Sequence, residues 1–134
     1  FGTEDVGEVV RGLEQEGWWE KTRHAVMRHV AKRGTPADLD VLVARGVNLR
    51  EDVRPLLGTT MLHVAAAEGR LKMVAHLLEH HRVDPNVLAE PFDPARFVTS
   101  ALCQATSKGR DRVVAFLLTR RKRLRSLVAE SHVD

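Results

Sequence analysis

Residues 58–78 read GTTMLHVAAAEGRLKMVAHLL. This stretch has the pattern of two short helices that are separated by a glycine. Thr60 is a hydroxyl residue in the position that caps the N-terminus of the first helix. Gly69 can end that helix, because glycine adopts the left-handed backbone conformation at little cost. Beyond Gly69 the apolar residues recur with helical spacing, which predicts a second, amphipathic helix carrying Leu71, Val74, Leu77 and Leu78.

A second copy of this pattern lies 40 residues further along the chain. Residues 98–118 read VTSALCQATSKGRDRVVAFLL, with Ser100 in the capping position and Gly109 at the break between helices. The same residue type recurs at a constant offset in Leu62 and Leu102, Ala65 and Ala105, Gly69 and Gly109, Val74 and Val114, Leu77 and Leu117, and Leu78 and Leu118. Such a match indicates an internal repeat, in which each helix pair buries its apolar face against its neighbours.

A weaker copy precedes these two. Gly34, Leu39, Leu42 and Val43 align with the second-helix positions of residues 69–78 at an offset of 35. Its first helix is expected from about residue 20 to 32, with Val26, Met27, Val30 and Ala31 on the apolar face. Further upstream, Val6, Val9, Val10 and Leu13 predict one more amphipathic helix, ending near Gly17. The chain is therefore expected to be all-α.

The repeated unit resembles the ankyrin repeat. Residues 60–66 resemble its signature Thr-Pro-Leu-His-x-Ala-Ala, and residues 69–78 resemble its continuation Gly-His-x-x-hydrophobic-Val-x-x-Leu-Leu. Residues 83–86 resemble the turn that leads into the family's β-hairpin finger. The resemblance covers residues 20–48, 58–86 and 98–118. It implies an ankyrin-repeat solenoid of about three helix–turn–helix units with N- and C-terminal capping helices.

This resemblance divides one domain, residues 1–134, into five segments. They are an N-terminal cap helix at 1–19, a degenerate repeat at 20–57, a repeat with an extended finger at 58–97, a repeat at 98–119 and a basic C-terminal cap at 120–134. The finger is expected to be long because the spacing of 40 exceeds the family's roughly 33 residues. Met61 replaces the signature proline and Cys103 the signature histidine. We expect Cys103 to be a buried, small apolar residue.

Composition narrows the class of protein further. The 134 residues include a single cysteine, which excludes an intrachain disulfide and a cysteine-ligated zinc site. No apolar stretch is long enough to span a bilayer, and we expect an intracellular protein, cytoplasmic or nuclear. The chain begins with Phe1, so we expect it to be a segment of something longer. The net charge of +3 is polarised: residues 1–20 hold six acidic residues and one basic residue, and residues 108–125 hold eight basic residues and one acidic residue.

The resemblance implies a protein–protein interaction scaffold that binds another protein or a segment of the parent chain. Ankyrin stacks present a concave face of first helices and a row of finger tips. The expected partner-binding residues on the first helices are Glu68, Gln104, Ser107 and Lys108. Those in the fingers are Arg50, Glu51, Leu88, Glu90, Phe92 and Arg96. Five residues have expected structural roles: Thr60, His63, Gly69, Ser100 and Gly109. The resemblance implies that the His63 imidazole forms a hydrogen bond with Thr60.

The basic segment supports an alternative function, the binding of nucleic acid or another polyanion. The residues that would carry it are Arg110, Arg112, Arg120, Arg121, Lys122, Arg123 and Arg125. The same cations could instead complete the dipole of the last helix and form its solvated face. The absence of interleaved aromatic residues gives little support for base stacking. The opposite charges of the two ends also allow head-to-tail self-association.

We expect no enzyme, no catalytic residues, no cofactor and no metal site. His76 and His80 are spaced one helical turn apart with His81 adjacent, which can hold a metal ion. No acidic or cysteine partner is close in sequence other than Glu79, which points off that face, so a solvated helix face is favoured. Asp38 and Asp40 are expected near a helix start, where acids interact favourably with the dipole. Of Trp18 and Trp19, one is expected to be buried in the N-terminal cap and the other partly exposed.

Overall fold

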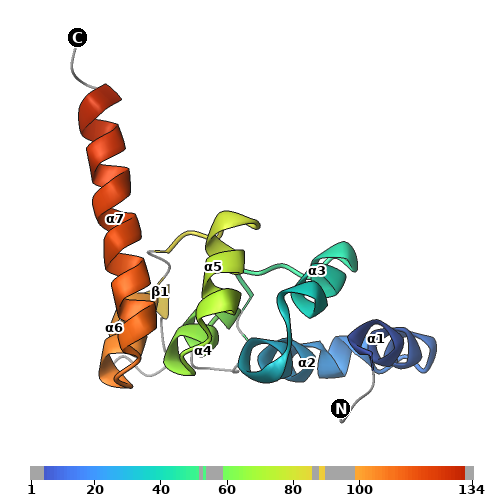
Figure 1. Cartoon of the computed structure of the whole chain (residues 1–134). Helices are drawn as coiled ribbons and strands as arrows, with labels where there is room; N and C mark the ends of the chain where they lie inside the picture. Colours follow the sequence, from blue (N-terminus) through green and yellow to red (C-terminus); the bar gives the residue numbers. More distant parts are fainter. Residues whose placement is uncertain (1–4, 52, 54–58, 86–87, 90–98, 132–134) are drawn as a thin grey trace.

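The computed structural model describes residues 5–51, 53, 59–85, 88–89 and 99–131. Within these ranges, side chains are described for all residues except 88–89, 99 and 122–131. Helices make up most of this part of the chain (Figure 1). They are α1 (Val6–Gln15), α2 (Trp19–Arg33), α3 (Pro36–Ala44), α4 (Met61–Ala67), α5 (Leu71–Glu79), α6 (Ala101–Ser107) and α7 (Asp111–Ser131). Two strands, β1 (Leu88–Ala89) and β2 (Thr99–Ser100), are each two residues long. The all-α prediction is confirmed.

The helices stack in two rows (Figure 1). The first helices α2, α4 and α6 pack side by side, and the second helices α3, α5 and α7 do the same. Each first helix also packs against the second helix that follows it. The arrangement is that of a solenoid in which each helix pair contacts its neighbours along the chain.

Several helices begin and end with identifiable local chemistry. Thr35 and Asp38 form a reciprocal capping box at the start of α3, with Thr35 N–H donating to Asp38 Oδ2 at 2.9 Å and Asp38 N–H donating to Thr35 Oγ1 at 3.2 Å. The Ser100 hydroxyl accepts a hydrogen bond from the Cys103 N–H at 3.3 Å at the start of α6. Gly69 and Gly109 have φ angles of +73° and +69°, which favour glycine at the ends of α4 and α6. The predicted breaks are confirmed.

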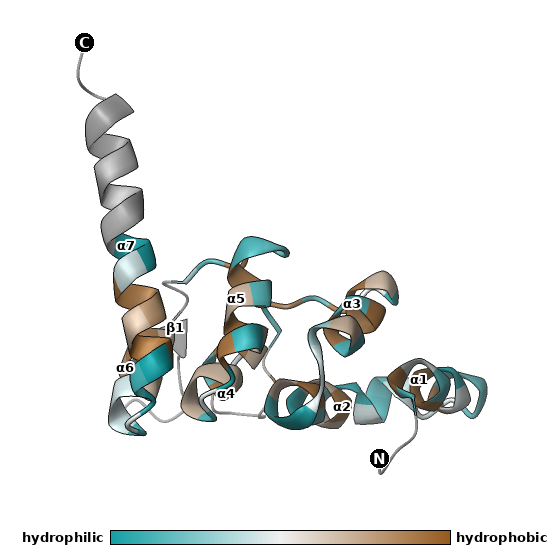
Figure 2. Ribbon diagram, viewed as in Figure 1, coloured by the Kyte–Doolittle hydropathy of each residue, from teal (hydrophilic) through white to brown (hydrophobic). Residues whose placement is uncertain are grey.

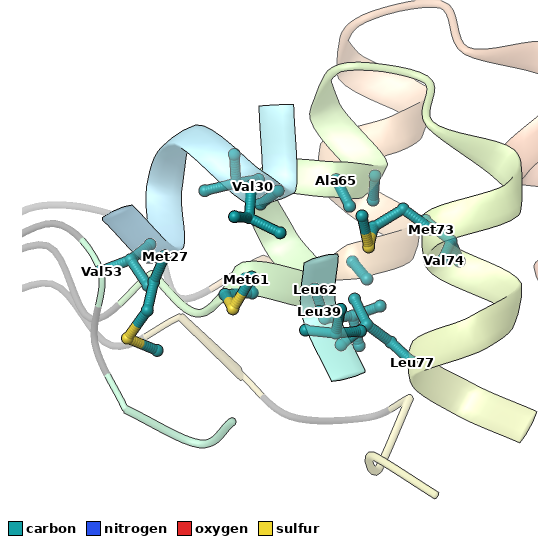
Figure 3. Close-up of a cluster of buried hydrophobic side chains, with 14 of the residues drawn as sticks. Met27, Val30, Leu39, Val53, Met61, Leu62, Ala65, Met73, Val74 and Leu77 are labelled. Atoms are coloured by element: carbon teal, nitrogen blue, oxygen red, sulfur yellow. The ribbon is translucent and has the colours of Figure 1, made fainter. Parts of the chain in front are cut away.

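The core lies between the two rows. Figure 3 shows side chains from α2, α3, α4 and α5 pointing toward one another, among them Val30, Leu39, Met61 and Leu77, all fully buried. The helices carry both hydrophobic and hydrophilic residues, as expected for amphipathic segments (Figure 2). Small buried residues on α4 and α6 let these two helices approach closely: Ala65, Ala66, Ala101 and Ala105.

The N-terminal helix agrees with its prediction. Helix α1 buries Val6 and Val10 and packs against both α2 and α3, so that it covers the N-terminal end of the stack. Trp19 packs partly buried against the core. Trp18 is 51% exposed, with the Lys21 ammonium 5.2 Å from the centre of its ring. One tryptophan is thus buried more than the other, as their positions on a helix predict.

The C-terminal boundary differs from its prediction. A repeat ending at residue 119 and a separate basic cap were expected, but α7 runs without a break from Asp111 to Ser131. The physical reason is that no glycine or proline lies between residues 110 and 131 to end the helix. The basic run therefore continues the helix that buries Val113 and Leu117, and its second half extends beyond α5 and α6 (Figure 1).

The finger of the middle repeat is described at its base. Strands β1 and β2 pair antiparallel, with Leu88 opposite Ser100 and Ala89 opposite Thr99. This pairing joins the two sides of the expected insertion. Residues 90–98, which carry the rest of the finger, lie outside the described residues.

Candidate functional site

A shallow depression of about 280 Å³ lies between α4 and α6, on the row of first helices. Its lining brings together three of the four residues that were predicted for this face: Glu68, Gln104 and Lys108. The fourth, Ser107, is exposed next to Lys108 at the end of α6. The other lining residues are Thr59, His63, Val64, Ala67 and Arg110.

A buried hydrogen-bond pair at the start of α4 fixes one lining residue. His63 is 1% exposed, and its Nδ1 atom lies 2.8 Å from Thr60 Oγ1 and 3.2 Å from the Thr60 backbone nitrogen. Because the Thr60 N–H donates to Nδ1, we assign the ring proton to Nε2. The predicted bond between His63 and Thr60 is confirmed. The imidazole holds the first turn of α4 in place beneath the depression.

The rim of the depression is charged. Glu68 ends α4 and lies 3.9 Å from Lys32 Nζ of the preceding repeat, with both side chains more than a third exposed. Such a surface pair contributes little to stability, which leaves the Glu68 carboxylate available to a partner. Lys108 ends α6 and is exposed. The depression thus has an acid on one helix and a base on the other.

Arg110, which was predicted to bind a polyanion, makes a contact between two repeats. Its Nε donates a hydrogen bond of 2.9 Å to the carbonyl oxygen of Ala67, the last residue of α4. Its side chain also lies across Gly69, where a Cβ atom would come within 2.9 Å of Arg110 Cδ. Arg70, 40 residues earlier, also bonds to the end of the preceding first helix, with its Nη2 donating to the carbonyl of Gly34 after α2. The pair Gly-Arg in both copies was the signal from which this contact could have been inferred.

The predicted finger residues divide into three groups. Arg50 is exposed, whereas the Glu51 carboxylate forms an ion pair with Arg23 of α2 and lies 3.6 Å from His24 Nε2. This pairing ties the loop after α3 to α2. Leu88 lies in β1 at the base of the finger. The remaining predicted residues, Glu90, Phe92 and Arg96, lie outside the described residues.

The predicted polyanion-binding residues follow the course of α7. Arg112 and Arg121 are exposed, and Arg120 is half-buried with an Nε atom that has no hydrogen-bond partner within the described part of the chain. Lys122, Arg123 and Arg125 lie on the same helix, but their side chains are outside the described set.

Cys103 is exposed rather than buried, which corrects the prediction from sequence. It lies on the first turn of α6, on the side away from the buried Ala101 and Ala105. Hydrogen bonds with Ser100 lower the pKa of the Cys103 thiol below its ordinary value, because they stabilise the thiolate.

A second polar cluster lies in the row of second helices. Asp40 Oδ1 of α3 is 2.7 Å from His76 Nε2 and 2.7 Å from His81 Nε2, although Asp40 precedes the two histidines by 36 and 41 residues. The hydrogen bond with His76, with a further contribution from His81, lowers the pKa of the Asp40 carboxyl. Asp38 caps α3 as expected, but Asp40 lies past its first turn. The Asp40 carboxylate therefore interacts with the two histidines and not with the helix dipole. Because of this contact, His76 and His81 do not lie on a fully solvated helix face.

Comparison with known proteins agrees with this architecture. A family model described as ankyrin repeats, in three copies, matches residues 27–126. The chain therefore belongs to the ankyrin-repeat family, whose repeats are generally protein–protein interaction modules and are typically non-catalytic. No curated protein matches the sequence. None of the helices in the described part of the chain combines the length and apolarity needed to cross a membrane.

Proposed function

We propose that this domain binds another protein, or a segment of its parent chain, at the depression between α4 and α6. The observation that supports this most is the convergence of side chains that the core does not use. Glu68, Gln104 and Lys108 come from two adjacent repeats and line one hollow on the first-helix face. A site that depends on two repeats fits the way in which a solenoid builds an extended binding surface.

The size and chemistry of the depression indicate what it would accept. Its volume of about 280 Å³ is at the small end of the range of about 300–1,000 Å³ that is usual for small-molecule sites. It therefore suits one or two side chains of a protein partner. Val64 and Ala67 provide apolar lining, and the charges of Glu68 and Lys108 at the rim would set the orientation of that partner.

The test is an affinity capture that compares two charge reversals of the same kind. Lys108→Glu changes the rim of the depression, and Lys72→Glu changes an exposed lysine of α5 in the other row. Proteins retained by wild type and by Lys72→Glu, but lost from Lys108→Glu, would support the proposal. Equal retention by both variants would contradict it. Matching circular dichroism spectra and unfolding midpoints would establish that both variants are folded.

The finger is proposed as a second part of the same partner-binding surface. Leu88 marks the described base of this finger, Phe92 and Arg96 belong to its inserted segment, and Arg50 lies in the corresponding loop after α3. We expect alanine replacement of Phe92 and Arg96 to weaken the binding of the captured partner at least tenfold. An unchanged affinity would remove the finger from the interface.

A second candidate function, polyanion binding, is supported by the course of α7. This helix is 21 residues long and extends beyond its neighbours with the basic run on its second half (Figure 1). Binding to nucleic acid through these cations would weaken steeply with salt, because bound counterions are released. Neutralising Arg120, Arg121, Lys122 and Arg123 should abolish salt-dependent binding to heparin or duplex DNA. If wild type shows no such binding at low salt, this candidate fails.

A further inference from the structure

The cluster on the second helices brings together four side chains with metal-ligating atoms. Asp40 comes from the interior of α3, His76 from the last turn of α5, and His80 and His81 from the residues that follow. One ligand atom from each side chain can be chosen so that all four lie within 4.8 Å of one another. Only the three histidines are close to one another in the sequence. The acidic partner, Asp40, precedes His76 by 36 residues.

The backbone after α5 holds the histidines in this arrangement. The His80 and His81 N–H groups both donate to the His76 carbonyl, at 3.0 and 3.2 Å. Arg82 has a φ angle of +53° and is the single described residue other than glycine with a positive value. This turn folds the chain back beside the helix, so that the His81 ring meets the other two edge-on.

The three rings are packed more closely than hydrogen bonding alone requires. The His76 and His80 rings are stacked with centres 4.6 Å apart, and the centre of the His81 ring lies 5.1 Å from that of His76 and 4.8 Å from that of His80. Asp40 Oδ1 bonds to His76 and His81 but not to His80. His80 therefore completes a set of donor atoms without contributing to the hydrogen bonds that join α3 to α5.

We propose that Asp40, His76, His80 and His81 bind a zinc ion that links α3 to α5. Three imidazole nitrogens and one carboxylate oxygen form a ligand set typical of Zn²⁺, whereas Ca²⁺ and Mg²⁺ prefer oxygen ligands. Two histidines at positions i and i+4 of a helix are a common element of zinc sites.

The separations in the cluster suit a tetrahedral ion after small side-chain rotations. Zinc–ligand bonds of about 2.0–2.1 Å place neighbouring ligand atoms roughly 3.3 Å apart. The measured pairs range from the 2.7 Å hydrogen bonds to at most 4.8 Å. The required shifts are on the order of 1 Å, within reach of rotations about side-chain bonds. Side-chain exposures of 22% for His76 and 45% for Asp40 leave the cluster accessible to an ion from solvent.

The ion would act as a cross-link between adjacent repeats. Helices α3 and α5 belong to successive helix pairs, and their ligands are 36 to 41 residues apart in the chain. Zinc that binds the folded state alone would raise the unfolding temperature, with an effect that grows with zinc concentration. This inference is independent of the proposed partner-binding surface in the other row.

The test is a titration of the metal-free protein with ZnCl₂ by calorimetry, together with Co²⁺ as a spectroscopic probe. We expect one equivalent to bind, the visible spectrum of tetrahedral Co²⁺, and a rise of several degrees in the unfolding midpoint with zinc. His80→Asn should weaken binding at least tenfold and preserve the metal-free fold, since His80 is exposed and does not bond to Asp40. The matched control His29→Asn, on α2, should bind like wild type.

Three results would overturn the proposal. They are the absence of saturable one-to-one zinc binding, equal affinity in wild type and His80→Asn, and a Co²⁺ spectrum of six-coordinate type. A rise in unfolding midpoint that Mg²⁺ produces as well as Zn²⁺ would also contradict it.

Discussion

The guanidinium of Arg110 donates a hydrogen bond of 2.9 Å to the carbonyl oxygen of Ala67, across the boundary between two repeats. Arg70 makes a related bond one repeat earlier, from its Nη2 to the carbonyl of Gly34. Both carbonyls lie at the C-terminal end of a first helix, where backbone acceptors have no partner within the helix and the dipole favours a cation. The two arginines thus satisfy exposed helix ends and join successive helix pairs in the same way.

Arg110→Ala should therefore lower the free energy of unfolding by about 1–2 kcal/mol, because a charged donor is removed from a carbonyl that it satisfies. Arg112→Ala provides the control, since Arg112 is exposed on the next turn and its loss should change stability by about 0.5 kcal/mol or less. Urea unfolding followed by circular dichroism measures both values. Equal values for the two variants would remove Arg110 from the inter-repeat contact.

Leu39→Ala should destabilise the domain by about 2–5 kcal/mol, because Leu39 is fully buried among α3, α4 and α5 and its loss leaves a cavity. The control Leu118→Ala removes a leucine that is 48% exposed on α7 and should cost much less. Denaturant unfolding of the two variants provides the comparison. If Leu118→Ala lowers the free energy of unfolding as much as Leu39→Ala does, the location of the core between the two rows of helices is contradicted.

Much of this fold could be predicted from local chemistry. Thr60, Gly69 and Gly109 mark helix boundaries through backbone preferences that act within a few residues, and the 40-residue offset reveals the stacking. Contacts between distant residues could not be predicted in this way. The Asp40–His76 bond depends on how α3 and α5 pack, and local sequence around either residue does not contain that information.

Two errors had signals in the sequence. The uninterrupted helix α7 follows from the absence of glycine and proline after residue 110, although the run of charges suggested a separate segment. The exposure of Cys103 agrees with its place two residues from both Ala101 and Ala105, on the side of α6 opposite these buried alanines. The family resemblance aligns Cys103 with the buried His63, which favoured a buried cysteine. The residues next to Cys103 differ from those next to His63.

Removing residues 1–17 should lower the unfolding midpoint by several degrees, because α1 buries Val6 and Val10 against α2 and α3. Terminal caps are required in repeat stacks to cover the apolar end. Differential scanning calorimetry of the shortened and complete chains measures the change. An unchanged midpoint would mean that α1 does not stabilise the stack.

Alkylation of Cys103 by iodoacetamide in the folded protein should proceed without denaturant, because the thiol is exposed. The rate reports the thiolate fraction, so hydrogen bonds with Ser100 that lower the thiol pKa should move the midpoint of the pH–rate curve below that of an ordinary cysteine. Ser100→Ala should move this midpoint back to higher pH. A curve that Ser100→Ala leaves in place would contradict the assigned cause.

The most direct measurement of the central claim is site-specific photo-crosslinking in cells. A benzophenone amino acid is placed at Ser107, an exposed residue at the end of α6 next to Lys108 of the depression, or at Ala115, an exposed position of α7 outside the lining of the depression. The account predicts that Ser107 gives discrete protein adducts on irradiation, that Lys108→Glu suppresses them, and that Ala115 does not give the same adducts. The same adducts from Ala115, or adducts at Ser107 that Lys108→Glu leaves unchanged, would contradict a partner-binding surface at the depression.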